Sequence, residues 1–266
     1  MPETRKSGRL LPVLIVLIVG TVAADMVRRA LRGQANPPAD TTAPASGAPR
    51  RPNGDPDPAL TSEAQSGRSE TVDRNAAARR EGVRQRIRDD SSRTYLSGPL
   101  IETDSMLRRW PDDRIGRPLR VAITRQDVSG FREDFVANVA WAVSRWNGVV
   151  PVGLMSTGDS GQADVVVTWV ASLDSNRTGR TDLTWDQRGT IHRAAIVLAT
   201  HTPEGQPLDA RRMSALALHE LGHSLGLGHS PSRADAMYPI ATSAELSERD
   251  RRTALLLYDL PPGSIR

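Results

Sequence analysis

Hydrophobic positions divide this chain of 266 residues into three stretches. Residues 10–24 (LLPVLIVLIVGTVAA) are an unbroken apolar run, whereas residues 33–75 are rich in Pro, Gly, Ala, Ser and Thr and lack apolar periodicity. Such a composition cannot bury enough apolar surface to fold. From about residue 95 apolar positions return in regular patterns. We therefore predict one compact domain over residues 95–266, preceded by a flexible Pro- and Arg-rich linker over residues 28–94.

One part of that linker has a helical composition. Residues 76–90 (AAARREGVRQRIRDD) are rich in helix formers, but Val83 and Ile87 are their only large apolar side chains. A helix with so little apolar surface gains little from packing. We expect an exposed or transient helix there.

Within residues 95–266 the apolar period changes between that of a strand and that of a helix. The run ADVVVTWV at 163–170 predicts a buried central strand, and Asp186 to Gly189 predict a hairpin-like connection between two later strands. The order of strand, helix, several strands and then helices predicts an α+β fold with helices packed on one mixed sheet. The predicted strands are 118–124, 151–155, 163–170, 178–185 and 190–198, and the predicted helices are 131–146, 208–225 and 247–258.

Composition and charge limit the classes of protein that fit. The chain has no cysteine, which excludes disulfides, thiolate metal ligands and a cysteine nucleophile. Residues 1–120 carry 21 Lys and Arg against 15 Asp and Glu, whereas the remainder carries 14 against 16. The basic residues are interleaved with acids and prolines and lack a nearby aromatic motif, so we do not expect nucleic-acid binding. The single lysine beside abundant Arg and Ala is typical of a GC-rich bacterial genome.

The apolar run near the start of the sequence predicts export. Three basic residues, Arg5, Lys6 and Arg9, precede it, as in the positive n-region of a signal. One interpretation is a signal-anchor over residues 10–27, with residues 1–9 in the cytoplasm; the other is a cleaved signal peptide. We favour the anchor because the run is unbroken and no compact Ala-x-Ala site follows it. Both interpretations place the domain outside the cytoplasm, either membrane-bound or secreted or periplasmic.

Residues 219–229 read HELGHSLGLGH and hold three of the five histidines in the chain. His219 and His223 are four residues apart, so they share one face of a helix and can reach one metal ion together. Gly226 can adopt a positive φ and end the helix, which allows His229 to turn back toward the same ion. Three neutral imidazoles leave a fourth position open for water, as a hydrolytic Zn²⁺ site requires.

Glu220 follows the first histidine directly, and its carboxylate can lie beside the metal without ligating it. Zn²⁺ lowers the pKa of bound water from about 15.7 toward about 7, and Glu220 would accept the water proton as general base. Two alternatives are a structural zinc site and surface histidines without a metal. Structural sites are usually closed by four ligands and dominated by cysteine, which this sequence lacks.

The motif HELGHSLGLGH resembles the HExxHxxGxxH signature of the metzincin zinc endopeptidases. Residues 236–239 (AMYP) resemble the methionine turn of that clan, and Ser230 with Met-Tyr-Pro is similar to the matrixin branch, the matrix-metalloprotease-like catalytic domain. The resemblance covers roughly residues 95–260. It implies a twisted mixed sheet with an active-site helix, a long N-terminal helix and a C-terminal helix. It also implies site roles: zinc ligands His219, His223 and His229, general base Glu220, methionine turn Met237, and Pro239 in the pocket wall beside the scissile bond.

The resemblance further implies an extended peptide bound antiparallel to an edge strand, for which residues 190–198 are the matching strand. Three features depart from the family. The missing cysteine excludes latency by a propeptide thiolate. His192 and His201 lack the spacing of a second zinc site, and the acids available for calcium, Asp159, Asp174, Asp182 and Asp186, are scattered. Ala241 stands where relatives often carry Tyr, which changes the pocket.

The leading hypothesis is therefore a zinc endopeptidase that acts on extracytoplasmic proteins or peptides, and we expect it to be a monomer. A second hypothesis is a non-catalytic module that binds zinc and holds peptides; an intact Glu220 argues against it. A third is an envelope interaction protein whose function lies in the basic N-terminal segment.

Overall fold

The computed structural model describes residues 58–266 except 115–116, 151–153, 158 and 175. The predicted segments 1–9 and 10–27 lie outside the described residues. None of the described helices combines the length and the apolar composition that a membrane crossing requires. In chain order the elements are α2 (Pro58–Asp89), α3 (Ser97–Glu102), β1 (Met106–Leu107), the 3-10 helix η1 (Asp112–Arg114), β2 (Leu119–Ile123), α4 (Glu133–Trp146), β3 (Leu154–Thr157), β4 (Val165–Val170), β5 (Gly179–Trp185), β6 (Ile191–Ala199), α5 (Ala210–Ser224), α6 (Glu248–Asp259) and β7 (Gly263–Ser264).

Five of the strands form one mixed sheet in the order β3-β2-β4-β6-β5. The first four are parallel to their neighbours, and β5 pairs antiparallel with β6. The central position of β4 confirms the prediction for 163–170. Its side chains alternate, with Val165, Val167 and Trp169 buried, as expected for a strand with one face against the core.

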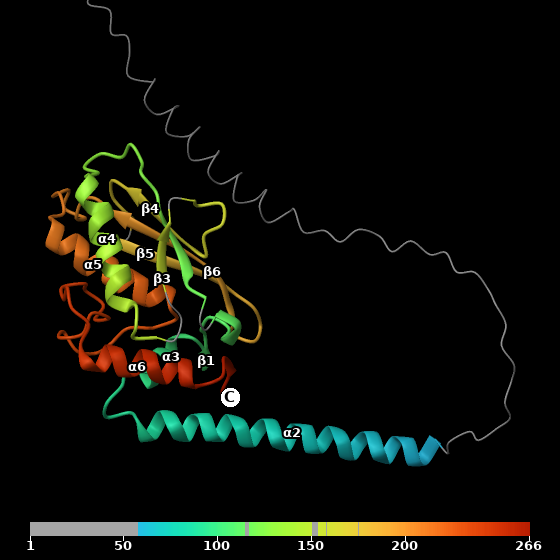
Figure 1. The fold of residues 1–266 in the computed structure, drawn as a ribbon. Helices are drawn as coiled ribbons and strands as arrows, with labels where there is room; N and C mark the ends of the chain where they lie inside the picture. The colour runs from blue at the N-terminus through green and yellow to red at the C-terminus, as the bar shows by residue number, and fades with distance from the viewer. Residues whose placement is uncertain (1–57, 115–116, 151–153, 158, 175) are drawn as a thin grey trace, which may run out of the picture. The chain divides into compact units, whose positions relative to one another are not determined.

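Helices α4 and α5 lie side by side against the sheet (Figure 1). The helix predicted over residues 131–146 is confirmed as α4. Its residues Phe135, Val139 and Trp146, which recur at helical spacing, are buried on one face. The indole N–H of Trp146 donates to the carbonyl of Leu218 at 2.9 Å, which fixes α4 to α5. The α+β class with an active-site helix and a C-terminal helix is therefore confirmed.

The position of the edge strand corrects one prediction. Residues 190–198 were expected at the edge, but β6 has β4 on one side and β5 on the other. The edge is β5, which pairs with β6 alone within the described sheet. The hairpin itself was predicted, but a turn sequence does not indicate which of its two strands joins the rest of the sheet.

The region before the domain also differs from the prediction. Residues 58–89 of the expected linker form helix α2, which contains nearly all of the helix expected over residues 76–90 and extends it toward the N-terminus. Val83 and Ile87, one turn apart, are buried and belong to the hydrophobic core, and the guanidinium of Arg84 donates to the carbonyl of Ile265 at 2.5 Å. Two apolar residues at i and i+4, together with the Arg84 contact, join the last turns of this helix to the core, so the folded unit begins before residue 95.

Candidate metal centre

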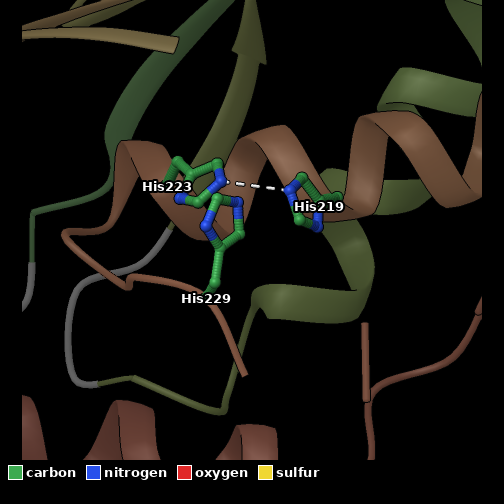
Figure 2. Close-up of side chains that lie close together, drawn as sticks. All are labelled: His219, His223 and His229. Atoms are coloured by element: carbon green, nitrogen blue, oxygen red, sulfur yellow. Dashed lines mark hydrogen bonds between the residues drawn. The ribbon is translucent and has the colours of Figure 1, made fainter. Parts of the chain in front are cut away.

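The structure brings three histidines together at the end of α5. His219 and His223 lie on the helix and His229 on the loop that follows it, with the three imidazoles facing one another (Figure 2). One ligand atom from each lies within 4.8 Å of the others, close enough for one metal ion to contact all three. Helical spacing and the reversal after the helix therefore produce the cluster that the motif predicts.

The end of α5 is fixed so that the loop returns to the helix. Gly226 has φ +95°, and the N–H groups of Gly226 and Leu227 donate to the carbonyls of His223 and Gly222 at 2.9 and 3.1 Å. These two bonds form a Schellman motif, in which the residue after the C-cap adopts the left-handed conformation. A Cβ on Gly226 would lie 2.1 Å from the carbonyl oxygen of Arg108, so no side chain fits there.

Two buried side chains satisfy the remaining carbonyls at this end of the helix. The indole of Trp110 donates to the carbonyl of Ser224 at 2.9 Å, and the hydroxyl of Tyr258 donates to that of Leu225 at 3.1 Å. The last carbonyls of a helix lack partners within the helix. Here the carbonyls have partners from the segment after β1 and from α6. The helix end that carries the histidines is therefore held by two other parts of the chain.

The hydrogen bonds of the imidazoles fix which nitrogen is available to a metal. Nδ1 of His219 lies 2.8 Å from the carbonyl of Ala236, and Nδ1 of His223 lies 2.8 Å from that of Leu227. Carbonyl oxygens only accept, so both Nδ1 atoms carry the proton and both Nε2 atoms present lone pairs. These Nε2 atoms are 3.0 Å apart (Figure 2). Two lone pairs this close favour a cation between them, and orientation by carbonyls is typical of zinc-binding histidines.

Electrostatics favour the same neutral state. Burial lowers the pKa of His219 to about 4, and the neighbouring His223 adds to the effect. Burial also lowers the pKa of His223 to about 4. Neutral imidazole is the form that binds zinc. The donor set and its protonation therefore fit Zn²⁺.

Glu220 is buried, with 5% of its surface exposed, and lines the same cleft as the three histidines. Burial raises the pKa of its carboxyl, while the hydroxyl of Thr181, His219 and Arg177 lower it. Thr181 on β5 donates to Glu220 Oε2 at 2.6 Å. A carboxylate in this setting can exchange a proton inside the cleft without the competition of bulk water.

The predicted methionine turn lies against the helix that carries the histidines. Met237 is fully buried, and its carbonyl accepts from the N–H of Ser230 at 2.8 Å. A Cβ on Gly222 would lie 2.3 Å from the sulfur of Met237 and 3.0 Å from the Trp146 ring. The glycine inside the motif is therefore what allows the turn to approach α5 this closely.

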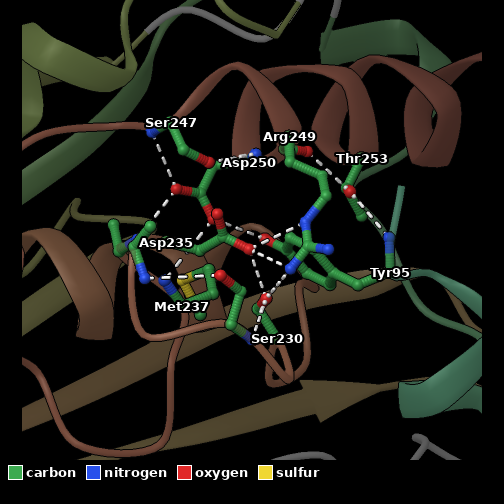
Figure 3. A network of polar contacts seen from close by, with 11 residues as sticks. Tyr95, Ser230, Asp235, Met237, Ser247, Arg249, Asp250 and Thr253 are labelled. Atoms are coloured by element: carbon green, nitrogen blue, oxygen red, sulfur yellow. Dashed lines mark hydrogen bonds and ion pairs between the residues drawn. The ribbon is translucent and has the colours of Figure 1, made fainter. Parts of the chain in front are cut away.

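A buried polar network connects this turn to α6 (Figure 3). Asp250 accepts from the N–H of Ala236 at 2.8 Å, the N–H of Met237 at 3.4 Å and the hydroxyl of Tyr95 at 3.0 Å. It also completes a capping box with Ser247, which begins α6 within one residue of the predicted helix start. One carboxylate thus fixes the turn, the helix and the segment entering the domain.

A second carboxylate in the same network is Asp235. It is buried and accepts from the hydroxyl of Ser230 and from the guanidinium of Arg249 at 2.5 Å. Burial acts to raise the pKa of this group, but the donors Ser230, Ser247 and Arg249 outweigh it and leave the pKa below its ordinary value. Because Ser230 follows His229 directly, this ion pair fixes the base of the loop.

The centre opens into a cleft of about 1060 Å³. One wall comes from β5 and includes Thr181 and Leu183, and the other includes Pro239 of the methionine turn and Ala241 after it. Leu96, Pro99 and Leu100 of the segment around α3 also line it. Pro239 lines the cleft, and its place beside the scissile bond stays a prediction.

The remaining candidate ligands lie elsewhere in the described residues. His192 is an exposed residue of β6 that contacts Asp186 at 3.6 Å and is not among the residues lining the cleft. His201 lies in the loop after β6, with Nδ1 2.9 Å from the hydroxyl of Thr200. Among the described residues, no group of three or more His, Asp or Glu other than the three-histidine cluster is placed to hold an ion.

The three histidines could hold one metal ion, and the buried Glu220 lines the same cleft, an arrangement that fits the metallopeptidase class. The family model for matrixin matches residues 117–259, more than half of the chain. The chain belongs to the matrixin family and is a zinc metalloendopeptidase. A comparison with curated proteins finds no match.

Sequence reasoning missed three residues around this centre: Gly222, Gly179 and Thr181. Gly222 had a signal, because glycine inside a helix costs about 1 kcal/mol relative to alanine and usually marks a close contact. Gly179 would place a Cβ 2.3 Å from Glu220 Oε1. It had no comparable signal, nor did Thr181, since glycine and threonine are unremarkable at the start of a strand.

Proposed function

We propose that His219, His223 and His229 hold one catalytic Zn²⁺ and that Glu220 is the general base for hydrolysis of peptide bonds in extracytoplasmic proteins or peptides. The observation that carries the proposal is the pair of histidine Nε2 lone pairs, 3.0 Å apart, in a cleft that Glu220 also lines. Zinc, when bound, supplies a Lewis acid that polarises the scissile carbonyl and makes water more acidic.

The chain's own residues account for the rest of the chemistry. The carboxylate of Glu220 accepts a proton from the attacking water and delivers it to the nitrogen of the leaving amine. Nδ1 of His219 and of His223 stay protonated on the carbonyls of Ala236 and Leu227, so the imidazoles keep their orientation during the reaction. The walls of the cleft exclude part of the solvent around the reacting groups.

Substrate binding would use the edge of the sheet. Strand β5 lines the cleft, and its outer side has no partner within the described sheet. An extended peptide can add to such an edge through main-chain hydrogen bonds, which demand little of its sequence. The wall formed by Pro239 and Ala241 would then supply the preference for the side chain beside the scissile bond.

The location rests on the sequence. The apolar run 10–24 behind Arg5, Lys6 and Arg9 supports an exported domain, either anchored by residues 10–27 or released by cleavage. We propose the anchored form, a monomer that acts on substrates outside the cytoplasm. Bacterial origin stays a prediction from composition.

The proposal is tested with the full chain and an unstructured protein such as casein, followed by mass spectrometry of the products. We expect cleavage that a chelator abolishes and that one equivalent of Zn²⁺ restores. Zinc bound at one per chain without cleavage of any peptide in a diverse library would instead support a peptide-binding module and would refute the enzymatic role.

A further inference from the structure

The carboxylate of Glu220 is held by β5, the strand on which α5 packs. The hydroxyl of Thr181 on β5 lies 2.6 Å from Glu220 Oε2 and 3.1 Å from the main-chain carbonyl of the same residue. Thr181 is 39 residues away in sequence, so only the packing of α5 on β5 brings the two together. Both possible acceptors of this hydroxyl belong to Glu220.

A single hydroxyl proton can be given to one acceptor at a time. The carboxylate is the nearer acceptor, and a hydrogen bond to a charged group is roughly twice as strong as one between neutral groups. A buried carboxylate without such a donor would turn to find one or would be costly to keep ionised. The hydroxyl therefore fixes Oε2 and leaves Oε1 as the oxygen that can exchange a proton.

Gly179 completes the contact from the same strand. Residues two apart in a strand face the same side, so Gly179 and Thr181 both face α5. A Cβ on Gly179 would lie 2.3 Å from Glu220 Oε1 and 2.8 Å from Cδ. The glycine makes room for the carboxylate, and the threonine two residues later holds it.

We propose that Thr181 is a positioning residue for Glu220. Strand β5 would then both form the edge of the cleft and orient the general base. The inference rests on the proposed function of Glu220. It predicts that the hydroxyl, and not the size of the side chain, matters. Removing the hydroxyl leaves the substrate contacts of the cleft in place but lets the carboxylate adopt other rotamers, so turnover falls more than substrate affinity.

The first test compares kcat and KM of three full-length variants with those of the unmodified chain. We expect Thr181→Val to lower kcat about 10- to 100-fold with KM within about two-fold, and Thr181→Ser to stay within about three-fold in both. Thr168→Val is the matched control, because Thr168 on β4 donates to a main-chain carbonyl at 3.2 Å and does not line the cleft. An unchanged kcat in Thr181→Val, or a loss that Thr181→Ser shares, would overturn the inference.

The second test needs no enzymatic activity. It measures the Tm of the chelator-treated full chain with Thr181→Val alone, Glu220→Met alone and both together. We expect Thr181→Val to lower the Tm by about 3–6 °C when Glu220 is present and by less than about 1 °C after Glu220→Met. Equal losses in both backgrounds would overturn the inference.

The two tests separate this inference from the proposed function. In one outcome, the unmodified chain cleaves nothing while the Tm loss of Thr181→Val still depends on Glu220. That result would refute the peptidase proposal and establish the contact between Thr181 and Glu220. An active unmodified chain without coupling in Tm would refute the positioning role alone.

Discussion

Segment 219–229 and strand β5 both line the cleft, and they obtain their geometry in different ways. The segment is contiguous, and its three histidines are placed by helical periodicity and by the reversal at Gly226. Strand β5 contributes Gly179 and Thr181, whose relation to Glu220 exists only once β5 has paired with β6 and α5 has packed on the sheet.

This difference predicts how substitutions in segment 219–229 and in strand β5 will differ in their effects. A site encoded in one helix and its terminus depends on side-chain identity at fixed spacing. A contact between distant elements depends also on every interaction that holds those elements together. Substitutions in the histidine segment should therefore affect metal binding directly, whereas substitutions in supporting residues should act through stability or through the orientation of Glu220.

The largest expected effect comes from removing a histidine of segment 219–229. His219→Ala removes a proposed zinc ligand that burial and the carbonyl of Ala236 orient. Loss of an orienting partner alone typically costs 10–100-fold, so loss of the ligand should lower zinc affinity and hydrolysis by more than roughly 100-fold. Zinc per chain after dialysis against a competing chelator, together with the hydrolysis rate, measures this. The exposed His192 supplies the control, since His192→Ala should leave both quantities within about two-fold. A His219→Ala chain that keeps one zinc would contradict the ligand assignment.

The next effect concerns the network beneath the centre. Asp250→Asn places an amide N–H₂ among the donors from Ala236, Met237 and Tyr95. We expect the free energy of unfolding to fall by about 2–4 kcal/mol, measured by urea titration. Asp259→Asn is the matched control on the same helix; its exposed ion pair with Arg86 at 3.2 Å should contribute less than about 1 kcal/mol. Equal losses in the two variants would show that the network does not stabilise the turn.

A smaller effect concerns the approach of the methionine turn to α5. Gly222→Ala introduces a Cβ 2.3 Å from the sulfur of Met237. Met237 is flexible and can shift in part, so we expect a loss of about 1–3 kcal/mol in the free energy of unfolding. In α2, Gly82 has no atom within 4 Å of an added Cβ. Gly82→Ala should be neutral or stabilising by up to about 1 kcal/mol. A Gly222→Ala chain as stable as that control would contradict the close approach.

The smallest expected effect depends on pH. The donors around Asp235 hold its pKa below the ordinary value, so the ionised form is favoured in the folded chain. This contribution is fully present above the unfolded pKa of about 3.9 and is lost as pH falls through the lower folded pKa. Asp235→Asn should lower stability at pH 6 by on the order of 1 kcal/mol and weaken the acid dependence below pH 4. The exposed Asp127 gives a control, and an Asp127→Asn chain should keep the acid dependence. Identical acid profiles for both variants would contradict the shift.

Much of the fold could be predicted because its signals are local. Asp209 caps α5 by accepting from the N–H of Arg212 at 2.8 Å, and Ser247 caps α6, so both helices begin within two residues of their predicted starts. Strand β4 follows its apolar run for the same reason. The spacing of His219 and His223 determines their relative positions on α5, and the turn at Gly226 returns His229 to them.

The rest could not be predicted because it depends on pairing between distant segments. The turn between β5 and β6 predicts a hairpin but not that β6 joins β4, so the edge was assigned to the wrong strand. The sequence around Val83 and Ile87 does not indicate that these side chains pack against the core of the domain. Thr181 reaches Glu220 only in the folded chain, and its own surroundings in sequence resemble those of any exposed strand.

The central claim is that Glu220 moves the proton while three histidines hold zinc. Glu220→Gln tests it most directly, because the amide keeps the size of the side chain and removes its basicity. We predict one zinc per chain, an unchanged fold by circular dichroism and a kcat on casein-derived peptides lower by about 10²- to 10⁴-fold. A Glu220→Gln chain that binds zinc and hydrolyses these peptides at the unmodified rate would contradict the account.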